Sequence, residues 1–189
     1  MNIIAITGKS GSGKTTLARK LAESIDGVHI DMDQIGHQSI LDESVSNKLC
    51  EAFGDIILDE DGNIDRGKLG NLVFTDEAAK LKMYGITWGF IEHTIDSMIS
   101  NLNQYVILDY AMLPLVPYWE RAKIKILING DAEIRKQKVI ERDNIPEKYY
   151  DRRESASIDY SIYTFDLVFE NKYTEESLNQ MIETIKSKI

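Results

Sequence analysis

Residues 2–17 read NIIAITGKSGSGKTTL, and this stretch decides the fold. Its first part, residues 2–7, is a short run rich in β-branched side chains that stops at a glycine, which predicts a buried strand of a parallel sheet. Small residues follow, and apolar side chains then recur every four positions, which predicts an amphipathic helix over residues 15–25. The expected order is therefore strand, glycine-rich loop and helix.

The loop of residues 8–15, called the phosphate loop below, matches G-x-x-x-x-G-K-[ST] without a mismatch and in the structural context that this motif requires. Small residues let the backbone curl so that its N–H groups point at a triphosphate, and the helix adds the positive end of its dipole. We expect Lys14 to reach the β and γ oxygens and the Thr15 hydroxyl to be a ligand of Mg²⁺. The residues expected to bind the nucleotide are Gly8, Ser10, Gly11, Ser12, Gly13, Lys14, Thr15 and Thr16.

Strands alternate with helical patterns along the rest of the chain. We therefore expect an α/β fold with three layers and a mostly parallel five-stranded sheet, right-handed crossovers and a site at the carboxyl ends of the strands. The four further strands are expected at 28–33, 105–108, 124–128 and 166–170.

The length of 189 residues indicates a single domain. Within it, the mostly helical stretch 34–102 is interpreted as an insertion and residues 135–157 as a small helical lid. The core is then made of residues 1–33, 103–134 and 158–189.

Composition excludes several classes of function. The formal net charge of −9 disfavours nucleic-acid binding unless a local basic patch provides it. A single cysteine, Cys50, excludes an internal disulfide, and the three histidines do not complete a zinc-site spacing. The first apolar run is four residues long, so no secretory segment or membrane span is expected there, and the cytoplasm is the default compartment.

Acidic residues at the ends of two predicted strands are candidates for catalysis. Asp109 follows the strand 105–108, where a carboxylate can bind Mg²⁺ directly or through water; an acid that caps a strand end is the alternative. Asp31 and Asp33 alternate, so in one strand they share a face, and an aspartate there could accept the proton of an attacking hydroxyl. A solvated acidic turn is the alternative for this pair.

The predicted lid is basic. Phosphoryl transfer needs cations around the equatorial oxygens, and a mobile flap can supply them while it excludes water. A charged surface helix balanced by neighbouring acids explains most of these cations equally well, so we expect one to three of them to face phosphate. Seven of the 22 basic residues lie in this interval: Arg135, Lys136, Lys138, Arg142, Lys148, Arg152 and Arg153.

A GTPase switch is disfavoured. Residues 59–62 (DEDG) match the D-x-x-G string of such switches, but guanine recognition also needs Asn-Lys-x-Asp. The nearest candidate, residues 171–174 (NKYT), lacks the acid.

Beyond the phosphate loop, the chain resembles the dephospho-CoA kinase family over about residues 2–185. The family's FG…IL…DG-x-IDR…L…VF-x-D signature is matched by residues 53–58 (FGDIIL), 61–66 (DGNIDR), Leu69 and 73–76 (VFTD). Residues 30–33 (IDMD) are similar to its D-x-D strand.

The resemblance implies a P-loop kinase fold that transfers the γ-phosphoryl of ATP, with Mg²⁺, to the ribose 3′-hydroxyl of dephospho-CoA, the last step of coenzyme A biosynthesis. It implies small-molecule substrates and an acceptor-binding role for residues 34–102. The net charge and the short apolar run lead us to expect no nucleic-acid or membrane partner. The resemblance also implies that Asp33 is the base, that Lys14 and two lid arginines are catalytic, and that an asparagine contacts adenine. The residues taken over in this way are Asp31, Arg66 and Trp88 for the acceptor, Arg142 and Arg153 for the lid, and Asn171 for adenine.

Three positions depart from the family pattern. Trp88-Gly89 stands where the family has His-Pro opening a helix, Ala111 begins a segment where the family reads P-L-L-x-E, and Ser157 stands where a lid glutamine is expected. The ATP half of the pattern therefore fits better than the acceptor half. Two alternatives stay open, a kinase for a nucleoside, nucleotide or other small metabolite, and a nucleotide-binding regulatory module that hydrolyses ATP poorly.

Overall fold

The computed structural model describes residues 2–100 and 102–189. The chain forms two compact units. The sheet unit comprises Met1–Asp31 and Asn101–Ile189, and the helical unit comprises Met32–Ser100.

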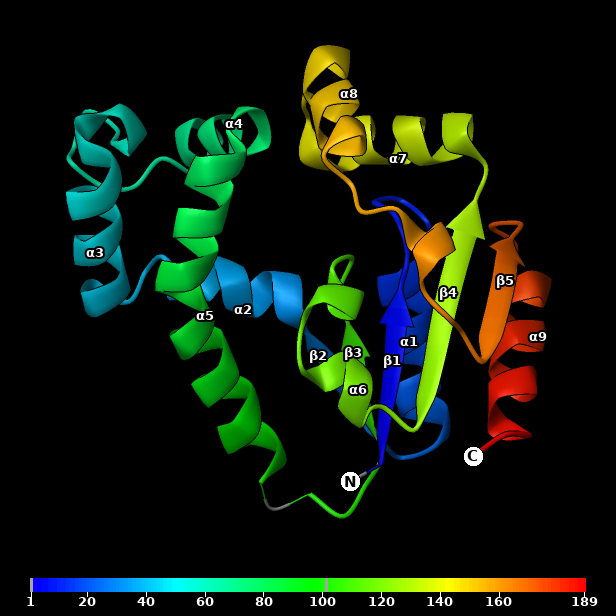
Figure 1. The fold of residues 1–189 in the computed structure, drawn as a ribbon. Coiled ribbons are helices and arrows are strands. Elements are labelled where there is room, and N and C mark those ends of the chain that lie inside the picture. Colours follow the sequence, from blue (N-terminus) through cyan, green and yellow to red (C-terminus); the bar gives the residue numbers. More distant parts are fainter. Residues whose placement is uncertain (1, 101) are drawn as a thin grey trace. The chain divides into compact units, whose positions relative to one another are not determined.

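The sheet unit contains a five-stranded sheet whose neighbouring strands are all parallel (Figure 1). The strand order is β2-β3-β1-β4-β5. The parallel sheet confirms the predicted α/β fold class. Parallel strands need crossover connections, and here helices lie between consecutive strands of the chain. The strands are β1 (Ile3–Thr7), β2 (Val28–Asp31), β3 (Val106–Asp109), β4 (Ile124–Gly130) and β5 (Leu167–Asn171).

Side chains alternate between the two faces of this sheet, and different helices cover each face. On one face, Ile4, Ile6 and Ile126 pack with residues of α1 (Lys14–Ser24) and α9 (Glu175–Lys186). Lys125 points to the other face, where its ammonium lies 5.1 Å from the ring centroid of Trp119 in α6 (Tyr118–Arg121). After β4 come α7 (Ala132–Asp143) and α8 (Glu147–Ser155), and two short 3-10 turns, η2 (Leu113–Leu115) and η3 (Tyr160–Ile162), complete the unit.

The helical unit is built around a core of its own, which includes Leu49, Ile57 and Leu69. Aspartates begin its helices: the carboxylate of Asp65 accepts from the N–H groups of Gly67 and Lys68, and Asp42 and Asp76 act in the same way. The elements are α2 (Met32–Ser39), α3 (Glu43–Phe53), η1 (Gly54–Ile57), α4 (Arg66–Thr75) and α5 (Glu77–Ile99).

The predicted strand 28–33 is two residues too long. β2 ends at Asp31, whose partner Asp109 is also the last residue of β3, so no neighbouring strand is left to continue the pairing. Met32 instead opens α2, and Asp33 lies in its first turn, where a negative charge is favoured by the helix dipole. Asp31 and Asp33 therefore do not share a strand face, and that part of the prediction was wrong.

The DEDG stretch is a local turn. Asp59 accepts hydrogen bonds from the N–H groups of Asp61 and Asn63, at 3.0 and 2.8 Å, and Leu58 forms an isolated bridge with Ile64. The carboxylate that a switch would use is thus occupied by its own loop.

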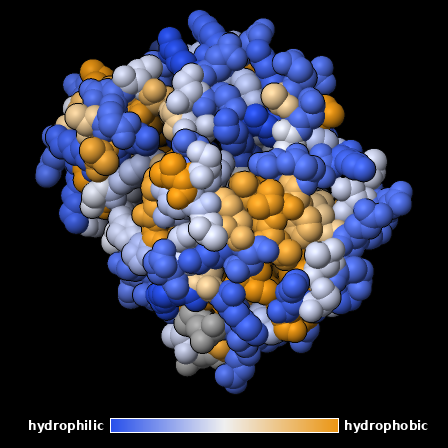
Figure 2. Space-filling view, turned by 45° about the vertical axis from the view of Figure 1, so that its right-hand side comes forward, coloured by the Kyte–Doolittle hydropathy of each residue, from blue (hydrophilic) through white to orange (hydrophobic). Residues whose placement is uncertain are grey.

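The surface is mostly hydrophilic on the face drawn in Figure 2, with apolar side chains gathered in patches. Large apolar side chains that are exposed include Leu41, Leu115, Ile162 and Val168. Within residues 2–100 and 102–189, no helix combines the length and the apolar character that a membrane span needs.

Candidate active site

The phosphate loop connects β1 to α1, as predicted. Gly13 has a φ of +92°, and a Cβ there would lie 2.3 Å from Nδ2 of Asn171. At Gly8, whose φ is +153°, a Cβ would lie 2.3 Å from the carbonyl oxygen of Ile128. Both positions require glycine, because a side chain would be strained and would also clash with β4 or β5.

Three side chains hold the outer side of the loop. Asn171 donates to the carbonyl of Ser12 at 2.8 Å, Tyr173 to that of Gly11 at 3.1 Å, and Arg135 to that of Ser10 at 3.3 Å. In a planar trans peptide the following N–H points the opposite way. The N–H groups of Gly11 and Gly13 therefore point away from Arg135 and Asn171, as an anion site requires.

Asn171 was expected to contact adenine, and the structure gives it two contacts within the protein. Besides binding the Ser12 carbonyl, it accepts a hydrogen bond from the N–H of Tyr173 at 2.8 Å. It lies at the end of β5, so the last strand of the sheet helps to shape the phosphate loop.

Polar side chains of the loop are buried at the start of α1. Lys14 is 7% exposed, and Ser12 Oγ is buried without a hydrogen-bond partner among the described residues. Thr15 and Thr16, in the first turn of the same helix, are exposed. The side chain of Lys14 is thus largely shielded from solvent, whereas Thr15 and Thr16 are accessible to solvent.

Asp109 is suited to bind a cation. It is 1% exposed, and neither carboxylate oxygen has a hydrogen-bond partner in the part of the chain that is described; Nε2 of His29 lies 3.7 Å from Oδ2. Its register partners are Ile6, two residues before the phosphate loop, and Asp31. A buried carboxylate without hydrogen bonds needs a cation nearby, so Asp109 and the exposed Thr15 fit Mg²⁺.

No cluster of three His, Cys, Asp or Glu side chains that could hold a metal occurs within the described ranges. Mg²⁺ does not need such a cluster, because it commonly takes one or two protein ligands together with substrate phosphates and water.

The lid arginines Arg142 and Arg153 meet at one carboxylate. Arg142 donates to Asp143 at 2.7 and 3.1 Å, and Arg153 also donates to Asp143. Burial by itself raises the pKa of Asp143, but hydrogen bonds from the two arginines outweigh it and lower that pKa. Asp143 therefore keeps the two cations close together at the end of α7.

Another lid cation forms surface ion pairs. Lys136 pairs with Glu147 and, at 3.3 Å, with Asp151. These contacts match the interpretation of most lid cations as a balanced, charged surface.

Lys9, Glu154 and Tyr173 belong to no predicted site, and Arg135 was expected only as one of the basic residues of the lid. Glu154 binds Lys9 at 2.7 Å and Arg135 at 2.9 Å, which links the phosphate loop to both lid helices. The residues are far apart in the chain, so no local pattern could have indicated the cluster.

Three of the other predicted site residues lie in the helical unit, whereas Asp31 ends β2 in the sheet unit. Asp33 is in the first turn of α2, Arg66 is the exposed first residue of α4, and Trp88 is half-buried in α5. Burial, followed by the negative charges of Asp33 and Glu77, raises the pKa of Tyr84 to about 12. Tyr84 is therefore a neutral hydroxyl within the electrostatic reach of Asp33.

Comparison with known proteins identifies the family. The family model of dephospho-CoA kinase matches residues 2–174. The dephospho-CoA kinase of Geobacter sulfurreducens is 29% identical over 195 residues, covering 100% of this chain and 98% of the relative. That of Fusobacterium nucleatum is 30% identical, covering 96% and 95%.

A crystal structure of TT1252 from Thermus thermophilus has the same fold, with a TM-score of 0.82 at 23% identity, covering 100% of this chain and 97% of that one. The match of the family model over nearly the whole length, with both relatives, shows that this chain belongs to the dephospho-CoA kinase family, whose members are phosphotransferases with an alcohol acceptor.

Proposed function

We propose that this protein transfers the γ-phosphoryl group of ATP to the ribose 3′-hydroxyl of dephospho-CoA, the last step of coenzyme A biosynthesis. One observation in the structure carries the ATP half of this proposal. The carbonyls of Ser10 and Ser12 in the phosphate loop are bound by Arg135 and Asn171, which turns the N–H groups of Gly11 and Gly13 in the direction that an anion site requires. Family membership supports the acceptor half.

The sheet unit would bind the triphosphate. Loop N–H groups and Lys14 would neutralise the β and γ oxygens, and Arg142 and Arg153 would add charge to the phosphoryl group in transit. Thr15 and Asp109 would hold Mg²⁺, which would supply positive charge to stabilise the phosphoryl oxygens. Charge and positioning would carry most of the catalysis, because phosphoryl transfer needs little covalent chemistry from the protein.

Most of the residues proposed to act on the acceptor lie in the helical unit. We assign Asp33 as the base that accepts the hydroxyl proton, and Asp31, Arg66 and Trp88 as acceptor-binding residues. The net charge of −9 favours small substrates over nucleic acid, and a cytoplasmic location without a membrane partner is part of the proposal.

Asp33→Asn tests the base. We expect turnover to fall by about 10²- to 10⁴-fold, the usual contribution of a general base, with ATP affinity changed by less than about twofold. Glu51→Gln, an exposed acid of α3 in the same unit, is the matched control and should keep wild-type turnover. Wild-type turnover in Asp33→Asn would show that another group takes the proton.

A different small acceptor is the second candidate, and Trp88-Gly89 favours it. α5 runs through these residues without a break, where the family pattern begins a helix with proline. Turnover on dephospho-CoA should be compared with a panel of nucleosides and nucleoside monophosphates. Transfer to a panel member without transfer to dephospho-CoA would reject the first candidate, and ATP binding without transfer to any acceptor would indicate a regulatory module.

A further inference from the structure

We propose that Glu154 is a positioning residue for the phosphate loop, because it binds Lys9 of the loop and the buried Arg135 at the same time. The inference deepens the proposed function and rests on it, since it concerns the same loop. Neither Arg135 nor Glu154 belongs to the loop, and Lys9 occupies a position that the loop motif leaves variable.

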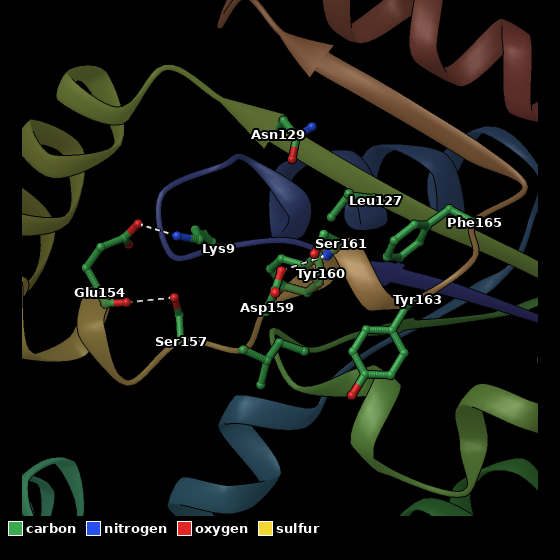
Figure 3. A pocket seen from close by; sticks show the side chains of 11 residues that line it. Lys9, Leu127, Asn129, Glu154, Ser157, Asp159, Tyr160, Ser161, Tyr163 and Phe165 are labelled. Carbon is green, nitrogen blue, oxygen red and sulfur yellow. Dashed lines mark hydrogen bonds and ion pairs between the residues drawn. The ribbon is translucent and has the colours of Figure 1, made fainter.

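The carboxylate of Glu154 is shared by cations from two other segments. Nζ of Lys9 donates to Oε1 at 2.7 Å, and Arg135 donates to both oxygens, at 2.9 and 3.1 Å. Figure 3 shows Lys9 reaching from the loop toward Glu154, which comes from α8. Bidentate pairs of arginine and carboxylate are among the strongest and most directional contacts in proteins, so this geometry fixes all three side chains.

Arg135 transmits this constraint to the loop. It is 5% exposed, and its guanidinium also donates to the carbonyls of Ser10 at 3.3 Å and Gly130 at 3.2 Å. The backbone of α7 is close as well, because a Cβ on Gly11 would lie 2.7 Å from the carbonyl oxygen of Arg135. A displacement of Arg135 would therefore displace the loop.

Glu154 provides the charge that keeps Arg135 in place. Without it, a buried guanidinium would lack its counter-ion and would be driven toward water. The hydrogen bond from Arg135, opposed by burial and assisted by a hydrogen bond from Lys9, lowers the pKa of Glu154 to about 2. The carboxylate is thus ionised at neutral pH.

The contact should matter for nucleotide affinity. Lys9 and Glu154 both line a cavity of about 660 Å³ beside the loop, which residues 157–161 also line (Figure 3). If Glu154 orients the loop, its loss disorders the N–H groups that bind phosphate. If it acted chiefly through its negative charge, its loss would instead strengthen phosphate binding.

Glu154→Gln separates these effects, because it removes the charge and keeps the shape. Calorimetry with ATP and Mg²⁺, without acceptor, should show a Kd raised by about tenfold, the scale of losing one hydrogen bond to a charged group. With saturating ATP, kcat should also fall, by no more than the loss in ATP affinity, because the same loop N–H groups stabilise the transferring phosphoryl group. The KM for acceptor should stay within about twofold of wild type. Glu147→Gln is the matched control, since it removes an equal charge from the same helix at the ion pair with Lys136 and should leave the Kd for ATP unchanged.

A second variant covers the case in which Glu154→Gln fails to fold. Lys9→Met keeps the buried pair of Arg135 and Glu154 and should weaken ATP binding by about threefold. In the double variant of Lys9→Met and Glu154→Gln, the Kd for ATP should rise by less than the product of the two single increases, because both substitutions break the same contact.

Unchanged or tighter ATP binding by Glu154→Gln would overturn the inference. A Kd for ATP in the double variant that rises by the full product of the two single increases would also overturn it. A wild-type protein that binds no ATP would refute the proposed function itself. The two failures are therefore distinguishable.

Discussion

Lys14 and Asp109 are buried ionisable side chains at the two sides of the proposed phosphate site, at the start of α1 and the end of β3. Burying a polar group without hydrogen bonds costs free energy, so each such group in a native protein calls for a partner. For Asp109, whose carboxylate oxygens have no hydrogen-bond partner among the described residues, a cation is the partner that fits. For Lys14, the loop motif leads us to expect a phosphate oxygen as the partner.

Lys14→Ala tests this assignment at the residue scale. We expect turnover to fall by at least about 10²-fold, the scale of losing one preorganised electrostatic donor. Lys20→Ala is a suitable control, because Lys20 lies in the same helix and pairs with Glu23 on the surface. Steady-state kinetics at saturating ATP is the measurement, and near-normal turnover would remove Lys14 from the mechanism.

Helix α5 contains Trp88-Gly89, one of the three places at which this chain departs from the family pattern. It runs for 23 residues and includes Gly85 and Gly89, around which an added Cβ would meet nothing within 4 Å. Glycine in a helix interior costs conformational entropy that packing does not repay here. The helix is therefore less stable than its length suggests.

Gly85→Ala should stabilise the protein by up to about 1 kcal/mol, the difference in helix propensity between alanine and glycine. Thermal or denaturant unfolding measures it. Gly13→Ala is the contrasting substitution and should be destabilising, because its Cβ would clash with Asn171 at a φ of +92°. A loss of stability in Gly85→Ala would mean that this glycine has a contact or a motion that the open space does not reveal.

Charge is distributed unevenly over the whole molecule. The net charge is −9, yet the lid is basic. At least four of its seven basic side chains form ion pairs with acids: Arg135, Lys136, Arg142 and Arg153. Those pairs depend on ionised carboxylates. Stability should therefore depend on pH through the acids whose pKa values folding lowers, among them Glu154 and Asp143.

Glu154 sets the clearest pH window. Folding lowers its pKa from an ordinary 4.5 to about 2, so its contribution to stability is complete above about 4.5 and is lost as the pH falls toward about 2. The contribution is at most about 3 kcal/mol. Denaturant unfolding of wild type and Glu154→Gln should differ most near neutral pH and converge toward pH 2, and a constant difference would contradict the lowered pKa.

The amino-acid sequence by itself determined the fold class, the phosphate loop and the family. These rest on local patterns: alternation of strands and helices, a consensus within residues 8–15, and the signature between 53 and 76. The end of β2 was missed, because the pairing of Asp31 stops where β3 stops, and strand ends depend on neighbours that are distant in sequence.

Tertiary structure alone decided how the loop is supported. Arg135, Glu154 and Tyr173 contact residues 9–11 across more than a hundred positions of the chain, and Asn171 is placed on Ser12 by the pairing of β5 with β4. Such contacts leave no periodicity and no consensus, because they follow from how the strands are ordered in the sheet. The sequence therefore predicts which groups bind phosphate, and the fold determines which groups hold the loop in position.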